Sequence, residues 1–266
     1  MNKWVKKSIK LAYSRGYLDR LMDIYPVNLT LTRNIDLSAK RKIEKLFRQR
    51  NIKKLISTLL SLERFPIDDP YVGFLRKNRE ALNRNPKTVK RIGSRLLKMG
   101  LDEILLGASK PKSPSRQVGQ MFRKWLNKLG YPVLPKNDFL KNNKIAILEG
   151  NDAFLMNFAR EELGYKGQKG LDMVLRVKNK FIIGETKLIT ASGGTQDKSF
   201  RESMSFIKQK DKKTIRVAIL DGVVWLVSKK TRLKKKKPSL YETITNLSSD
   251  KIALSALLLK DLIRSL

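Results

Sequence analysis

Cysteine and histidine are both missing from this sequence of 266 residues. Without cysteine, the chain forms no disulfide, offers no thiolate to zinc and has no thiol nucleophile. Without histidine, it has no imidazole to act as a general base, to bind a metal ion or to complete a Ser-His triad. Catalysis by this chain would therefore have to use carboxylates, lysine, hydroxyl groups or a hard metal ion.

Acidic residues are scarce, with 24 Asp and Glu against 58 Lys and Arg and a formal net charge of +34. A positive field of this size attracts polyanions, either nucleic acid or an anionic membrane. No apolar run approaches the roughly 18 residues of a transmembrane helix, and the basic N-terminus lacks the apolar core of a signal peptide. We therefore expect nucleic acid as the partner and no membrane. At 41% hydrophobic residues the chain can form one large domain or two modest ones.

Residues 1–108 predict a helical region that binds DNA, mediates dimerisation or does both. Apolar side chains recur at three- and four-residue spacings through much of it, with Lys and Arg between them. A helix is expected between Pro86, a first-turn proline, and Gly100, a stop. Arg91 and Arg95 project from this helix, which either reads DNA or packs on a core with a solvated basic face.

Residues 109–240 predict an α/β domain that begins in a loop rich in Pro, Ser and Gly at 107–118. Arg116, at the start of the helix that follows this loop, is a candidate phosphate contact. After a first apolar run, the pattern is helix, strand, strand, helix, strand, strand, which predicts a mixed sheet with helices against it. Residues 241–266 predict one or two helices that pack on this domain.

Two further segments of this domain have a simple interpretation. Asp221-Gly222, between two apolar runs, predicts a two-residue hairpin turn. Residues 229–237 hold seven basic side chains in nine positions and cannot pack in a core. They form either a disordered loop or a phosphate clamp.

The segment "LDMVLRVKNKFIIGETKLIT" contains the candidate catalytic and metal-binding residues. It predicts two strands joined by a polar turn, and alternate residues of a strand share a face. Glu185 and Lys187 therefore point the same way, and Thr186 points to the other face. The hairpin brings Asp172 close to Glu185, and a hard divalent cation such as Mg²⁺ removes the repulsion between the two carboxylates. The carbonyl of Thr186 offers one more ligand. Lys187 can orient or deprotonate a water and stabilise charge on a phosphorane-like transition state.

The turn after this hairpin adds further polar candidates. Gly193-Gly194 leads the chain out of the strand and starts the next helix. Gln196 lies in the first turn of that helix, where it can point at the metal site or at the scissile phosphate. Lys198 follows it as a candidate DNA contact. These groups, with the basic chain around them, suffice for hydrolysis of a phosphodiester bond.

The pattern of Asp172 followed by Glu185-Thr186-Lys187 resembles the PD-(D/E)xK nuclease superfamily, the fold of most type II restriction endonucleases. Leu171 stands where the superfamily often has Pro. "GETKLITASGGTQDKSF" is similar to a segment of restriction endonucleases that have GE-x-K followed by GG-x-Q, and the likeness covers about residues 110–210. The resemblance implies that the Asp and the Glu bind Mg²⁺ and that the Lys handles the attacking water.

The resemblance also implies an α/β fold with a restriction-endonuclease-like mixed-sheet core flanked by helices. The expected activity is Mg²⁺-dependent cleavage of double-stranded DNA at a specific sequence, in the cytoplasm of a prokaryote, with a companion DNA methyltransferase. Cutting both strands needs two sites, which predicts a homodimer. Superfamily members often add a carboxylate from the helix before the hairpin; Glu149 is favoured here over Glu161 and Glu162.

Two other functions remain open at this stage. The first is a structure-specific nuclease of the same fold, such as a Holliday-junction resolvase or a repair nuclease. The second is a non-catalytic nucleic-acid-binding protein in which the Asp, Glu and Lys lie together by chance.

Overall fold

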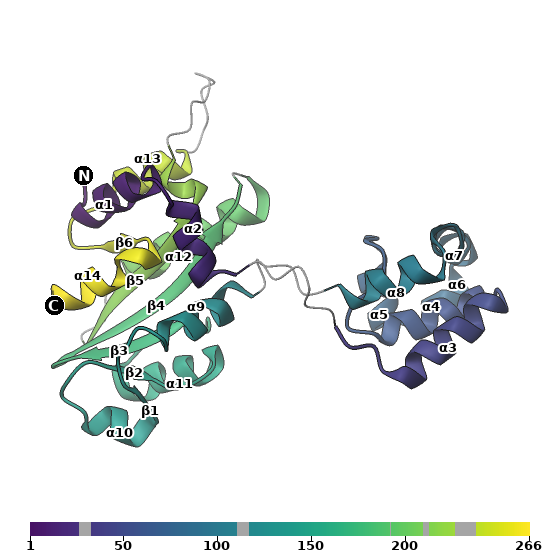
Figure 1. Cartoon of the computed structure of the whole chain (residues 1–266), viewed down its shortest axis with the longest axis horizontal. Coiled ribbons are helices and arrows are strands. Elements are labelled where there is room, and N and C mark those ends of the chain that lie inside the picture. The colour runs from purple at the N-terminus through teal and green to yellow at the C-terminus, as the bar shows by residue number, and fades with distance from the viewer. Residues whose placement is uncertain (27–32, 111–116, 192, 210–212, 227–237) are drawn as a thin grey trace. The chain divides into compact units, whose positions relative to one another are not determined.

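The computed structural model describes residues 1–26, 33–110, 117–191, 193–209, 213–226 and 238–266. The chain forms two compact units (Figure 1). Met1–Val27 and Ser113–Leu266 together form one, here called the sheet unit, and Asn28–Lys112 forms the other, here called the helical unit. The helical unit is therefore an insertion in the sequence of the sheet unit.

A six-stranded mixed sheet forms the centre of the sheet unit, in the order β1-β2-β3-β4-β5-β6. Strand β2 pairs antiparallel with β3 and β3 with β4, whereas β1–β2, β4–β5 and β5–β6 are parallel pairs. This confirms the predicted mixed sheet. The strands are β1 (Val133–Leu134), β2 (Ala146–Leu148), β3 (Met173–Val177), β4 (Lys180–Ile189), β5 (Thr214–Gly222) and β6 (Ile252–Leu254).

Helices surround this sheet (Figure 1). Large side chains that are almost fully buried, such as Phe122, Phe158, Phe200 and Trp225, fill the space between helices and strands. The helices are α1 (Lys3–Ala12), α2 (Tyr17–Ile24), α9 (Val118–Leu126), α10 (Lys136–Lys141), α11 (Asp152–Leu163), α12 (Gly194–Lys208), α13 (Leu240–Thr245) and α14 (Leu259–Arg264), with short 3₁₀ turns η2 (Val223–Trp225) and η3 (Ala256–Leu258).

The helical unit has a core of its own, centred on aliphatic side chains such as Ile43, Leu55, Ile56, Ile92 and Leu96. Its α7 begins at Pro86 and ends before Gly100, as the sequence predicted. The helices are α3 (Leu37–Arg48), α4 (Ile52–Ser61), α5 (Val72–Lys77), α6 (Ala81–Arg84), α7 (Pro86–Met99) and α8 (Leu101–Ser109). In the described parts of the chain, no helix has the length and apolar composition needed to cross a membrane.

The boundaries of the two compact units differ from the domain boundaries predicted at residues 108 and 240. The first two helices pack with the sheet, because Trp4, Val5 and Ile24 are buried in its core. The C-terminal segment supplies strand β6 at the sheet edge as well as helices. Helical periodicity alone does not show which of two cores a helix joins.

The predicted hairpin at Asp221-Gly222 is wrong. Strand β5 runs through both residues, and the chain then turns into η2 after Gly222, whose φ is 90°. The Asp221 side chain is fully buried, and its carboxylate accepts hydrogen bonds from Tyr17, Tyr25 and Ser255. Its polarity is therefore satisfied inside the sheet unit, which a local turn rule cannot anticipate.

Candidate active site

The predicted hairpin of β3 and β4 is present. The two strands pair from Val177 with Lys180 at the turn to Met173 with Gly184 at the far end. One step further, the backbone N–H of Asp172 donates to the Gly184 carbonyl at 2.9 Å. Asp172 therefore lies beside Glu185 although thirteen residues separate them in the sequence.

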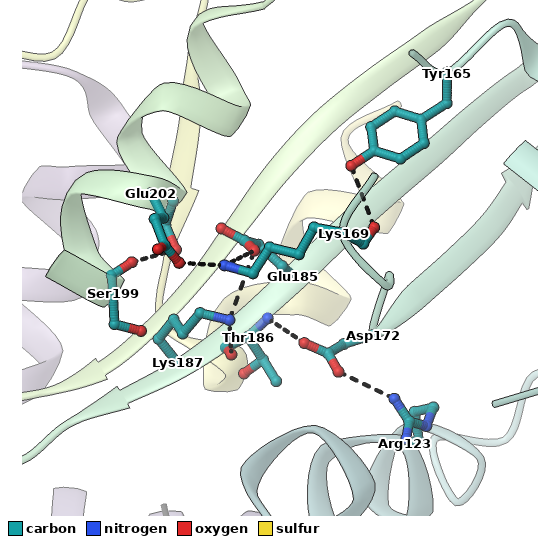
Figure 2. A network of polar contacts seen from close by, with 10 residues as sticks. Arg123, Tyr165, Lys169, Asp172, Glu185, Thr186, Lys187, Ser199 and Glu202 are labelled. Carbon is teal, nitrogen blue, oxygen red and sulfur yellow. Dashed lines mark hydrogen bonds and ion pairs between the residues drawn. The ribbon is translucent and has the colours of Figure 1, made fainter. Parts of the chain in front are cut away.

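Both carboxylate oxygens of Asp172 accept a hydrogen bond (Figure 2). The backbone N–H of Thr186 donates to Oδ2 at 2.9 Å, and Arg123 Nη1 on α9 donates to Oδ1 at 3.0 Å. Burial raises the pKa of Asp172 above its ordinary value, although the Thr186 N–H and the charges of Lys187 and Arg123 act in the opposite direction.

Glu185 is nearly buried, with only 2% of its side chain exposed. Its Oε2 lies 3.2 Å from Lys169 Nζ and 3.6 Å from Lys187 Nζ. Lys187 Nζ also donates to the Thr186 carbonyl at 3.2 Å. Glu185 and Lys187 thus share one face of β4, as the alternation of the strand predicted.

Lys169 connects two carboxylates. Besides contacting Glu185, its Nζ lies 2.7 Å from Glu202 Oε2 on α12 (Figure 2). Burial acts to lower the pKa of Lys169, but the contacts with Glu202 and Glu185 raise it overall. The site therefore balances three carboxylates with three cations: Asp172, Glu185 and Glu202 with Arg123, Lys169 and Lys187.

A cavity of about 760 Å³ opens beside these charges. Asp172, Lys187 and Glu202 line it, together with polar side chains of α9 and the first turn of α11. Gln196 lines it as well, from the first turn of α12, which begins after Gly193 as predicted. The cavity thus brings four of the predicted site residues, Asp172, Thr186, Lys187 and Gln196, to one solvent-accessible space.

Helix α9 approaches the carboxylate pair very closely at Gly119. A Cβ atom at this position would lie 2.1 Å from Asp172 Oδ1 and 3.6 Å from Arg123 Nη1. Only glycine lets α9 come this near, and this approach is what allows Arg123, one turn further along the helix, to reach Asp172.

The donor set fits a hard divalent cation. Within the described part of the chain, Glu185 Oε1 is a buried oxygen without a hydrogen-bond partner, so it retains its capacity to bind a cation. Each oxygen of Asp172 uses one lone pair, and a carboxylate has about four in total. Among the described residues, no group of three or more Asp, Glu, His or Cys side chains is arranged for metal binding. Two carboxylates suit Mg²⁺ nevertheless, because this ion keeps several waters and shares phosphate oxygens.

The structure does not bring the predicted helix glutamates to the cavity. Glu149 is exposed at the end of β2 and does not line the cavity. Glu161 and Glu162 both pair with Lys136 Nζ, at 3.0 and 2.8 Å. Glu202 instead supplies the additional carboxylate beside Glu185, from the helix after the hairpin.

The predicted DNA contacts lie at several places. Lys198 is exposed on α12, in a surface pocket that Glu202 also lines. Arg91 and Arg95 are exposed on α7 of the helical unit, where Arg91 pairs with Asp69. Arg116 and residues 229–237 lie outside the described residues.

Sequence reasoning missed Arg123, Lys169 and Glu202. Arg123 had a local signal, since it follows Gly119 by four residues and therefore shares a face of the predicted helix with it. Lys169 and Glu202 had none, because their contact with Glu185 depends on how a loop and a helix distant in sequence fold over β4.

Comparison with known protein families gives a match over almost the whole chain. The sequence profile of the Tsp45I type II restriction enzyme family matches residues 2–266, which is essentially the whole chain. No curated protein and no solved structure matches the chain significantly. The mixed sheet with flanking helices agrees with a restriction-endonuclease-like fold. The chain belongs to the Tsp45I type II restriction enzyme family.

Proposed function

We propose that this restriction endonuclease depends on Mg²⁺ and hydrolyses double-stranded DNA at a specific sequence. One observation carries the proposal: Asp172 and Lys187 line the cavity, the Glu185 carboxylate lies 3.6 Å from Lys187 Nζ, and its buried Oε1 has no hydrogen-bond partner among the described residues. The net charge of +34 supplies the attraction to the DNA backbone.

Asp172 and Glu185 would hold Mg²⁺, with the Thr186 carbonyl as a further ligand. When bound, Mg²⁺ acts as a Lewis acid that stabilises negative charge on the scissile phosphate. Lys187 orients the attacking water, or removes its proton, and stabilises the developing charge from the same side. Gln196, which lines the cavity, would contact the scissile phosphate or the metal. Glu149 remains an alternative ligand only if its exposed side chain turns toward the cavity.

The remaining cations of the site have a different task. Arg123 and Lys169 neutralise Asp172 and Glu185 before any DNA is bound. These contacts offset the repulsion between the two neighbouring carboxylates until a cation binds them.

Incubation of phage DNA with the purified protein and Mg²⁺ tests the proposal. We expect discrete, reproducible fragments, none in EDTA, and one sequence at all sequenced ends. A smear would instead indicate a non-specific or repair nuclease. Intact DNA, at protein concentrations that retard it in a gel, would indicate a junction-specific enzyme or a plain binder and would contradict the proposal.

Two active sites are needed to cut both strands, so we propose that the enzyme acts as a homodimer. The same digestion tests this on a supercoiled plasmid with one site. Linear product without accumulation of nicked circles supports two sites acting together, and complete nicking before linearisation argues against it. A restriction enzyme of this kind also requires protection of the host DNA, so we propose a companion methyltransferase and a prokaryotic cytoplasmic setting.

We propose further that the helical unit contacts DNA through α7. This helix carries five Lys or Arg side chains and no Asp or Glu, and Lys90 and Arg95 are exposed on it. DNA affinity falls as the salt concentration rises, and each lost phosphate contact makes the slope of log affinity against log salt less steep by about one. We therefore expect the double variant Lys90→Gln, Arg95→Gln to bind DNA more weakly and to have a slope that is less steep by about two.

The matched control changes two exposed lysines of the sheet unit, Lys141→Gln with Lys144→Gln, which alters the net charge equally. Titrations of labelled DNA at several salt concentrations give both slopes. An equal change of the slope in the two double variants would show that only the overall charge matters, and it would contradict a DNA contact through α7.

A further inference from the structure

A buried hydroxyl lies behind the carboxylate pair, on the opposite face of β4. Thr186 points away from Glu185 and Lys187, and its Oγ1 lies 3.0 Å from Tyr25 Oη, just after the end of α2. Tyr25 Oη in turn lies 2.9 Å from Asp221 Oδ2 on β5. All three of these side chains are buried. A chain of hydrogen bonds therefore connects α2 and β5 to the middle residue of the Glu-x-Lys motif.

The direction of these bonds follows from the acceptor at one end. Asp221 accepts from four donors: Tyr17 Oη, Tyr25 Oη, Ser255 Oγ and the backbone N–H of Ala256. Tyr25 has a single hydroxyl proton, and it donates this proton to Asp221. Tyr25 Oη must then accept from Thr186, which makes the threonine hydroxyl the donor. These bonds hold the Thr186 side chain in one rotamer.

The backbone of Thr186 contacts the site on both sides. Its N–H holds Asp172 Oδ2 at 2.9 Å, and its carbonyl accepts from Lys187 Nζ at 3.2 Å. A small rotation of this residue would therefore shift the metal-binding carboxylate and the catalytic lysine at the same time.

We propose that Tyr25 is a positioning residue for cleavage, which acts by fixing Thr186 from behind. The proposal rests on the endonuclease function proposed above. Packing does not require this arrangement, because an apolar side chain of similar shape at each position would fill the space without burying polar atoms. A fully satisfied polar network, in contrast, holds its members in one geometry.

Tyr17 provides the matched control. It also donates to Asp221, at 3.2 Å, and it accepts from the Gly222 N–H, but among the described residues it makes no hydrogen bond to Thr186. Tyr25→Phe and Tyr17→Phe should therefore lower Tm by similar amounts. Only Tyr25→Phe should reduce the single-turnover cleavage rate, or raise the Mg²⁺ concentration for half-maximal rate, by about 10-fold or more, as for other residues that orient metal ligands. Tyr17→Phe should stay within about twofold in both.

A second set of variants tests the route through Thr186. Thr186→Val should reproduce the loss seen in Tyr25→Phe, and the double variant should lose little more, because both changes break the same bond. Thr186→Ser, which keeps the hydroxyl, should retain more of the rate than Thr186→Val. The rise in Tm caused by Mg²⁺ gives a readout without cleavage, and it should shrink in Tyr25→Phe and remain in Tyr17→Phe.

Three results would overturn the proposal: equal rate losses in both Tyr variants, an unchanged rate in Tyr25→Phe, or additive losses in the double variant. Each of these results can be obtained only if the protein without substitutions cleaves DNA. If the unchanged chain does not cleave under any tested condition, the proposed function fails instead, so the two failures can be told apart.

Discussion

Glu185→Gln is expected to abolish cleavage while DNA binding is retained. Glutamine keeps the size of the side chain, but it removes the negative charge and replaces one carboxylate oxygen with an NH₂ group that cannot bind a cation. The buried Oε1 of Glu185 has no hydrogen-bond partner among the described residues and can therefore bind a metal ion. We expect the single-turnover rate to fall by at least about 10³-fold, and Asp172→Asn to have an effect of the same order. Gel retardation in EDTA measures DNA binding without cleavage.

Asp261→Asn is the control for this prediction. Asp261 lies on α14, about half exposed, and its only ion pair is a 4.0 Å contact with Lys7 among the described residues. The substitution changes the net charge by the same amount, and cleavage should be unaffected. Full activity in Glu185→Gln would place the active site elsewhere. A parallel loss of DNA binding and of Tm would make Glu185 a structural residue.

Gly119→Ala is expected to have the second large effect, although it adds only one methyl group. That carbon would lie 2.1 Å from Asp172 Oδ1, a distance that non-bonded atoms do not adopt. Either Asp172 turns away or α9 moves outward, and α9 carries Arg123, the partner of Asp172. A misplacement of about 1 Å at a reacting centre costs about 10²-fold in rate, which is the loss expected here.

Gly73→Ala separates this clash from a general effect of alanine. Gly73 lies in α5 of the helical unit, and an added Cβ would meet no atom within 4 Å. Cleavage by Gly73→Ala should match that of the unchanged chain, and its Tm should stay the same or rise. Normal cleavage by Gly119→Ala would mean that α9 does not hold Asp172 in the catalytic state.

The hairpin and its charged residues could be predicted from the sequence because their pattern is local. Two apolar runs joined by a polar turn predict β3 and β4, and pairing across this turn brings Asp172 beside Glu185. Lys187 lies on the face of Glu185 because alternate residues of a strand share a face. No information from distant parts of the chain enters these steps.

The surroundings of the hairpin could not be predicted, because they depend on contacts across the fold. Tyr25 and Thr186 are 161 positions apart, and Tyr17 and Asp221 are 204 apart. Asp221 beside Gly222 has the composition of an exposed turn, and the surrounding hydroxyl groups and the Ala256 N–H make its burial possible. Lys169 stands in a polar loop whose sequence does not distinguish it from many other lysines of this chain.

The insertion of the helical unit has a consequence for how such an enzyme can diverge. The chain leaves the sheet unit after α2 and returns before α9, and these two helices contact one another. The two ends of the insertion are thus tied to a pair of helices that pack together, which is where a fold tolerates exchange of a whole segment. Mutations between residues 28 and 112 can alter the helical core without changing any residue of the β3–β4 hairpin. Selection on the helical unit and selection on the hairpin can therefore act on separate parts of one gene.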